Sequence, residues 1–250
     1  YSFVTTQGSD NDQFVIVGNM IRSNTTFNYE SKNILYTYVE TNDGNGGTYN
    51  KQLIINILDA NDAPTNIAVS NLSVAENKSA GTFIGVLSST DEDGADNHTY
   101  TLVSGTGATD NSSFTISNDS LFSNAAFDFE TKSTYSIRVQ TNDGTVGFQK
   151  TFTVIVTDDN DAPTDLTLSN DQVVENLASG TAVGTLSTAD VDAGDSHTYK
   201  LAAGAGDTDN ARFKISGSQL LAAMSFDFET RDTMYVRAET KDASGSVFQK

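Results

Sequence analysis

The chemistry in this sequence lies in short acidic segments that recur in one order along the chain. Two of them, Asp59-Ala60-Asn61-Asp62 and Asp158-Asp159-Asn160-Asp161, each stand directly before an Ala-Pro pair. The others follow the patterns Glu-Asn, Asp-x-Glu and Asp-x-Asp, and a single Asp follows later. Clustered carboxylate and amide oxygens without Cys or His suit a hard cation, and Ca²⁺ accepts six to eight oxygens in irregular geometry whereas Mg²⁺ demands an octahedron. The segments therefore predict calcium sites.

We assign the candidate ligands to two sets, one around each Ala-Pro linker. The first ligand set is Glu30, Asp59, Asn61, Asp62, Asp91, Asp93 and Asp143. The second ligand set is Glu76, Asp128, Glu130, Asp158, Asn160, Asp161, Asp190, Asp192 and Asp242. Two like charges ~4 Å apart repel by roughly 4 kcal/mol at an effective dielectric constant of about 20. Each set should therefore push neighbouring domains apart when empty and hold them together when filled. Ordinary turn chemistry is the alternative interpretation of the linker residues.

The acidic segments belong to an internal repeat of 99 residues. The string Asn61-Asp62-Ala63-Pro64-Thr65 recurs as Asn160-Asp161-Ala162-Pro163-Thr164, an offset of 163 − 64 = 99. A third, upstream copy of the Asp-x-Glu segment reads Asn28-Tyr29-Glu30. Such self-similarity at a fixed spacing indicates tandem domains. We expect a partial repeat 1 over residues 1–63, a complete repeat 2 over 64–162, and a repeat 3 over 163–250 that lacks its last strand, so the natural protein should extend in both directions.

Strand signals dominate each repeat. Phe152, Val154 and Val156 alternate with polar or outward positions, which is typical of a strand with one buried face. We expect further strands near Ile67–Val69, Ser73–Ala75, Thr82–Leu87, Thr99–Val103 and Phe114–Ile116. No long segment shows helical periodicity. About seven short strands in 99 residues predict an all-β fold of tandem Greek-key, immunoglobulin-like β-sandwiches.

Composition narrows the possible partners. The 33 acidic residues outnumber 14 basic ones, for a net charge of −19, so nucleic acid and anionic membranes are disfavoured. Cysteine is absent, which excludes disulfides and thiolate sites and leaves bound metal as a means of stabilising the chain. No apolar run approaches the ~18 residues of a spanning helix, and no signal peptide opens the sequence.

The ordered motifs resemble those of cadherin repeats, most closely the cadherin-like repeats of bacterial adhesins. The resemblance rests on Asp-x-Asn-Asp-x-Pro linkers, on Glu76-Asn77, on Asp128-Phe129-Glu130 and on Asp190-Val191-Asp192. It implies up to three Ca²⁺ ions per linker, a further carbonyl ligand near Asn97 or Ser196, and an extracellular or cell-surface location. Asn28 departs from the motif because an Asp is expected there. The chain also has no Trp, so the Trp-swapped dimer of vertebrate adhesion cadherins gains no support.

The resemblance implies calcium-rigidified repeats that form a rod in a large adhesin and bind chiefly to their own neighbouring repeats. Direct recognition of a polysaccharide or protein ligand through exposed loops is the alternative, and the absence of Trp platforms weakens it. An enzyme is disfavoured, because a glycosidase-like carboxylate pair duplicated at every linker is improbable. His98 and His197 form no triad and are expected to be structural surface residues. Since Asn28 supplies a neutral oxygen, we expect the first ligand set to fill at higher calcium than the second.

Overall fold

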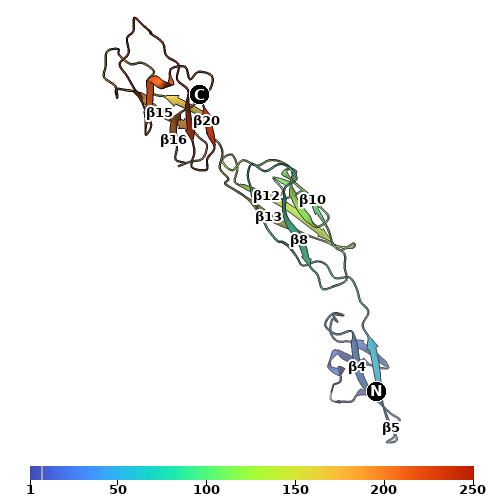
Figure 1. The fold of residues 1–250 in the computed structure, drawn as a ribbon. Coiled ribbons are helices and arrows are strands. Elements are labelled where there is room, and N and C mark those ends of the chain that lie inside the picture. Colours follow the sequence, from blue (N-terminus) through green and yellow to red (C-terminus); the bar gives the residue numbers. More distant parts are fainter. Residues whose placement is uncertain (7) are drawn as a thin grey trace. The chain divides into compact units, whose positions relative to one another are not determined.

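The computed structural model describes residues 1–6 and 8–250, and its regular secondary structure is almost entirely β-strand (Figure 1). Backbone contacts divide these residues into two compact units. The first comprises Tyr1–Leu72, Ser79–Ala125 and Tyr135–Val154; the second comprises Ser73–Lys78, Ala126–Thr134 and Ile155–Lys250. The division runs through repeat 2. As a result, the whole first ligand set lies in the first unit and the whole second ligand set lies in the second.

Repeat 1 contributes two small antiparallel sheets to the first unit. One has the order β1-β4-β5, formed by β1 (Ser2–Phe3), β4 (Ile34–Asn42) and β5 (Thr48–Asn56). The other pairs β2 (Phe14–Val17) with β3 (Met20–Ser23). Phe14 and Leu35 are buried, and the ring centroids of Phe14 and Phe27 are 5.4 Å apart.

Repeat 2 carries two four-stranded sheets, as expected for a sandwich. The first has the order β10-β11-β8-β6, with β10 (Phe114–Ser117), β11 (Ser120–Ser123), β8 (Phe83–Thr90) and β6 (Asn66–Val69). The second has the order β7-β13-β12-β9, with β7 (Ser73–Ala75), β13 (Gly147–Thr157), β12 (Thr134–Asn142) and β9 (Thr99–Leu102). The β7–β13 pair is parallel, with Val74 opposite Val156. This places Glu76, directly after β7, next to the linker that follows β13.

Repeat 3 repeats the pattern with fewer strands. One sheet has the order β14-β15-β18-β17, with β14 (Asp165–Leu168), β15 (Ala182–Ala189), β18 (Gln219–Ala222) and β17 (Phe213–Ser216). The other has the order β16-β19-β20, with β16 (Thr198–Leu201), β19 (Ala238–Lys241) and β20 (Val247–Gln249). Three short 3₁₀ helices, at Asn11–Gln13, Asn111–Ser113 and Asn210–Arg212, occupy the same place in the three repeats. No helix in the described part of the chain has the length and apolar character needed to cross a membrane.

The predicted alternation and the predicted all-β sandwich are confirmed. Phe152, Val154 and Val156 of β13 are buried while their neighbours along the strand are exposed. Ile137 and Val139 of β12 are fully buried in the same way, because side chains in a strand alternate between its two faces. The strand expected at Ser73–Ala75 is β7, but its counterpart at Gln172–Val174 is not a strand in the structure.

A recurrent Asp-Asn brace, made of Asp10-Asn11, Asp110-Asn111 and Asp209-Asn210, joins each 3₁₀ turn to a strand later in the repeat. The aspartate accepts a hydrogen bond of 2.8–2.9 Å from the backbone N–H of Tyr36, Ser136 or Tyr235. The asparagine Oδ1 accepts one of 2.9 Å from the backbone N–H of Tyr38, Arg138 or Arg237. Because the Asp209 carboxylate is 1% exposed and pairs with Arg231 at 2.7 Å, this brace is part of the core.

Candidate cation sites

In the first unit, the structure brings the seven residues of the first ligand set into one network. Ligand atoms of Glu30, Asp59 and Asp93 all lie within 4.8 Å of one another. The backbone N–H of Asp62 donates to Asp93 Oδ2 at 2.6 Å, and the backbone N–H of Asp93 donates to Asp91 Oδ1 at 3.2 Å. At the other end, Asn61 Nδ2 donates to Asp143 Oδ2 at 3.0 Å. Ligand atoms of Asp143, Asp91 and Asp96 form a second cluster, in which all lie within 4.8 Å of one another. Four separate segments thus meet in this network, and three of them line an open cavity of about 440 Å³.

Desolvation and mutual repulsion raise the pKa of two carboxyl groups in this network. A hydrogen bond from its own backbone lowers the pKa of Glu30, but desolvation and the charges of Asp59, Asp93 and Asp62 outweigh it and raise the pKa. Desolvation, followed by the charges of Glu92, Asp93, Asp91 and Asp59, raises the pKa of Asp62. The carboxylates therefore destabilise one another in the absence of a positive charge.

In the second unit, Glu76 is the best-enclosed residue of its set. It is 0% exposed, and its two carboxylate oxygens accept hydrogen bonds from the backbone N–H groups of Phe129 (2.6 Å) and Asp159 (3.0 Å). Ligand atoms of Glu130 and Asp158 lie within 4.8 Å of a Glu76 oxygen and of each other. Glu76 therefore both ties the linker to its own repeat and contributes charge to the site.

The rest of the second ligand set follows the same pattern as the first. The backbone N–H of Asp161 donates to Asp192 Oδ2 at 2.8 Å, and that of Asp192 donates to Asp190 Oδ1 at 3.2 Å. Asn160 Nδ2 donates to Asp242 Oδ2 at 3.0 Å. The pKa of Asp161 is raised, first by desolvation and then, against a hydrogen bond from Asn77, by the charges of Glu76, Asp192 and Asp128. All nine predicted residues are thus gathered in one region of the unit.

The late aspartates behave differently, because the turns around them donate hydrogen bonds. Desolvation raises the pKa of Asp242, but Asn160, the Ser244 hydroxyl and the backbone N–H groups of Gly245 and Ser246 lower it to about 2. Hydrogen bonds from the Asn61 side chain and from the backbone of Val146 and Thr145 likewise lower the pKa of Asp143. Each site thus contains one carboxylate whose pKa the surrounding hydrogen bonds lower, beside others whose pKa is raised.

The donor atoms fit a calcium ion. They are oxygens from four or five chain segments in each unit, as a hard cation of high coordination number requires. In addition, Asp192 Oδ1 and Asp195 Oδ2 are buried, and no hydrogen-bond donor among the described residues reaches them. Buried carboxylate oxygens without a partner are costly, and a bound cation would satisfy them.

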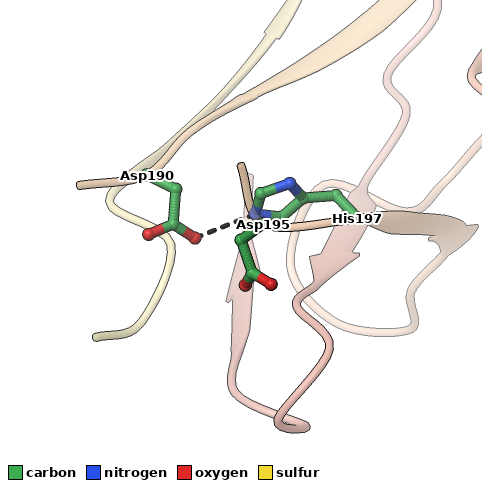
Figure 2. A group of neighbouring side chains, drawn as sticks. All are labelled: Asp190, Asp195 and His197. Carbon is green, nitrogen blue, oxygen red and sulfur yellow. Dashed lines mark hydrogen bonds and ion pairs between the residues drawn. The ribbon is translucent and has the colours of Figure 1, made fainter. Parts of the chain in front are cut away.

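Four residues at these sites escaped the sequence-based assignment. Asp96 belongs to the carboxylate cluster of the first unit and Asp195 to that of the second. The two residues are 99 positions apart, and this repeat spacing could have identified them. His98 and His197 hydrogen-bond to Asp91 (2.9 Å) and Asp190 (2.8 Å), the latter pair shown in Figure 2. Their side chains are only 14% and 13% exposed, so the expectation of surface histidines was wrong.

Glu92 is a fifth such residue and bears on Asn28. Asn28 Nδ2 donates to Glu92 Oε2 at 2.6 Å, and the carboxylates of Glu92, Glu30 and Asp62 form a cluster. Repeat 3 has Val191 at the corresponding place, so no repeat signal marked Glu92. The charge that Asn28 lacks is therefore present on Glu92. The predicted weaker filling of the first ligand set stays a prediction, with a smaller expected difference.

Comparison with known proteins bears on the fold and on repeat 2. Residues 70–157 match the family model of the cadherin domain. No curated protein matches the chain. Among solved structures, extracellular cadherin domains 1–4 of protocadherin gamma B7 align with a TM-score of 0.68 and 23% identity, over 100% of this chain and 66% of that one. Domains EC1–3 of mouse protocadherin-24 align with a TM-score of 0.68 and 17% identity, over 100% of this chain and 89% of that one.

A third structure, of protocadherin gamma B7 domains EC3–6 described as a cis-dimer, gives a TM-score of 0.65 and 20% identity over 99% of this chain. This chain spans 64% of its length. At these identities the likeness establishes the fold alone.

Proposed function

We propose that calcium bound at the two ligand sets stiffens tandem cadherin-like repeats of an extracellular surface adhesin, since residues 70–157 match the family model of the cadherin domain and the chain shares the fold of protocadherin domains. The proposed role is mechanical: the repeats hold other parts of the protein away from the surface. Their partners are then the neighbouring repeats of the same chain. Catalysis forms no part of this role.

One observation carries the proposal: each unit gathers carboxylates from its linker and from distant loops, and in the second unit Asp192 Oδ1 and Asp195 Oδ2 are buried and reached by no hydrogen-bond donor of the described residues. Glu76, Glu130 and Asp158 also cluster, and there the backbone N–H groups of Phe129 and Asp159 donate to Glu76. The cation of Lys78 pairs with Asp159, outside the ligand set, and both side chains are 49% exposed. A calcium ion would supply the missing positive charge and fix the linker relative to the loops that share it.

Calcium should raise the melting temperature of the 250-residue chain, whereas magnesium and zinc should raise it much less. Extracellular calcium modules commonly bind with Kd values of about 10⁻⁴ to 10⁻³ M. In 10 mM calcium, each site should therefore raise the free energy of unfolding by roughly 1.4–2.7 kcal/mol. Thermal unfolding followed by circular dichroism, with and without chelator, measures this. The proposal fails if neither calcium nor chelator moves the melting curve.

Asp161→Ala should loosen the linker between repeats 2 and 3 in calcium. The Asp161 carboxylate accepts a hydrogen bond from Asn77 at 3.2 Å and lies near the charges of Glu76, Asp192 and Asp128. Its loss removes a ligand from the linker itself. Small-angle scattering in millimolar calcium should show greater flexibility than in the wild type. Asp119→Ala is the matched control, since Asp119 is exposed and its side chain contacts Ser120 next to it. Identical scattering of all three proteins would contradict the assignment.

A further inference from the structure

The loop before β16 presents a carboxylate that the ligand motifs do not include. Asp195 and His197 lie in this loop, and together with Asp190 they offer three ligand atoms within 4.8 Å of one another (Figure 2). The backbone N–H of Asp195 donates to the carbonyl oxygen of Asp192 at 3.3 Å, which turns the loop back toward the Asp-x-Asp segment. Asp195 therefore stands beside two members of the second ligand set.

The environment of Asp195 requires a positive partner. Its Oδ2 is buried and is reached by no hydrogen-bond donor of the described chain, and the same holds for Asp192 Oδ1. A carboxylate oxygen left unpaired in a protein interior costs free energy unless a cation or donor approaches it. Two such oxygens, on residues joined by one turn, are atoms that a bound cation would satisfy.

His197 has a separate role in the same cluster. Its Nε2 lies 2.8 Å from Asp190 Oδ2, and the side chains of the two residues are 13% and 5% exposed. A hydrogen bond from an enclosed imidazole fixes the orientation of the carboxylate that it contacts. Repeat 2 has the same arrangement, in which His98 Nε2 lies 2.9 Å from Asp91 Oδ2 and Asp96 groups with Asp91 and Asp143.

We propose that Asp195 is a further calcium ligand of the second set and that His197 is a positioning residue that holds Asp190 toward the same ion. Asp96 and His98 have these roles in the first set. The inference rests on the proposed calcium function and deepens it, because it adds one carboxylate to each site. A higher ligand charge tightens calcium binding.

Calorimetric titration of the full chain with calcium tests the ligand role. Asp195→Asn keeps the shape and removes the charge, so it should weaken one group of sites by roughly 10- to 100-fold and leave the others unchanged. Asp232→Asn, an exposed residue of the same repeat, is the matched control and should leave every site unchanged. Wild-type affinity in Asp195→Asn would overturn the inference while leaving the proposed function intact; a wild type that binds no calcium would overturn both.

The positioning role is tested by rescue. His197→Ala should weaken binding by about tenfold, and His197→Gln should restore most of it, because the Gln side-chain amide can donate to Asp190 from nearly the same place. Loss without rescue would contradict positioning. If a repeat 3 variant is unfolded in chelator, Asp96→Asn and the His98→Ala and His98→Gln pair give the same comparison in repeat 2. Terbium luminescence adds a second readout: Asp195→Ala should add about one coordinated water to a bound Tb³⁺ ion, and an unchanged water count would refute direct ligation.

Discussion

Glu76→Gln should lower the free energy of unfolding by about 1–3 kcal/mol even without calcium, because one of two backbone N–H groups loses its charged acceptor. Those groups belong to Phe129 and Asp159, and the Glu76 side chain that serves them is fully buried. Glu76→Ala leaves both groups unpaired and should cost roughly twice as much. Chemical denaturation followed by circular dichroism in chelator provides the measurement.

Two comparisons make the Glu76 result specific. Glu130→Gln removes a neighbouring charge whose pKa is raised, first by desolvation and then by Glu76, Asp158 and Asp192 against a hydrogen bond from its own backbone. That variant should be neutral or stabilising in chelator and destabilising in calcium. Glu175→Gln, the counterpart in repeat 3, has a longer hydrogen bond of 3.0 Å to Phe228 and should cost less than Glu76→Gln. Equal effects of Glu76→Gln and Glu130→Gln in chelator would show that Glu76 acts by charge alone.

The pH dependence of stability should change direction when calcium is added. The pKa values of Asp62, Asp96, Glu130, Asp158 and Asp161 are raised above their ordinary 3.8 or 4.5, with desolvation the largest cause in each case. A raised pKa means that the folded chain holds the proton more tightly than the unfolded chain does. The resulting stability is complete below the ordinary pKa and is lost as pH rises through the raised value.

The lowered pKa values oppose this trend only in stronger acid. Asp242, with a pKa of about 2, contributes stability above 3.8 that disappears as pH falls toward 2. Calcium-free protein should therefore be most stable near pH ~4–5, whereas calcium-bound protein should be most stable near neutral pH, where protons no longer compete for its ligands. Melting temperatures from pH 3 to 8, with and without calcium, give the two curves. A calcium-free maximum at neutral pH would contradict the repulsion argued for the ligand sets.

Sequence patterns predicted the elements with strong local signals. The alternation in Thr151–Thr157 and the 99-residue repeat led to the β-sandwich, and the oxygen-donor motifs led to both ligand sets. Gln172–Val174 is not a strand although the same place in repeat 2 is one, because that strand pairs with Ile155–Thr157, the last strand that repeat 3 was expected to lack. Strand formation there depends on a partner strand distant in sequence, as β propensity generally does.

The side chains that escaped prediction did so because their environment is tertiary. Asp209 resembles an ordinary loop aspartate in sequence, yet it is 1% exposed and braces a strand 26 residues later. His197 is enclosed because Asp190, seven residues away, turns back onto it. Glu92 replaces a valine of the next repeat and so breaks the periodicity that identified the other ligands.

The hydrogen bonds of the Asp-Asn brace and of Glu76 should form in a fixed order as repeat 2 folds during synthesis. The Asp110–Ser136 bond of the brace closes a loop of 26 residues, whereas the Glu76–Asp159 bond spans 83. Shorter loops close at a smaller entropic cost, and during synthesis at about 5–20 residues per second the second partner of Glu76 emerges roughly 4–17 s after it. The brace can thus form while β13 is still unmade, but Glu76 and its carboxylate neighbours meet only when the linker has left the ribosome. The cation site is therefore the last part of the domain to assemble.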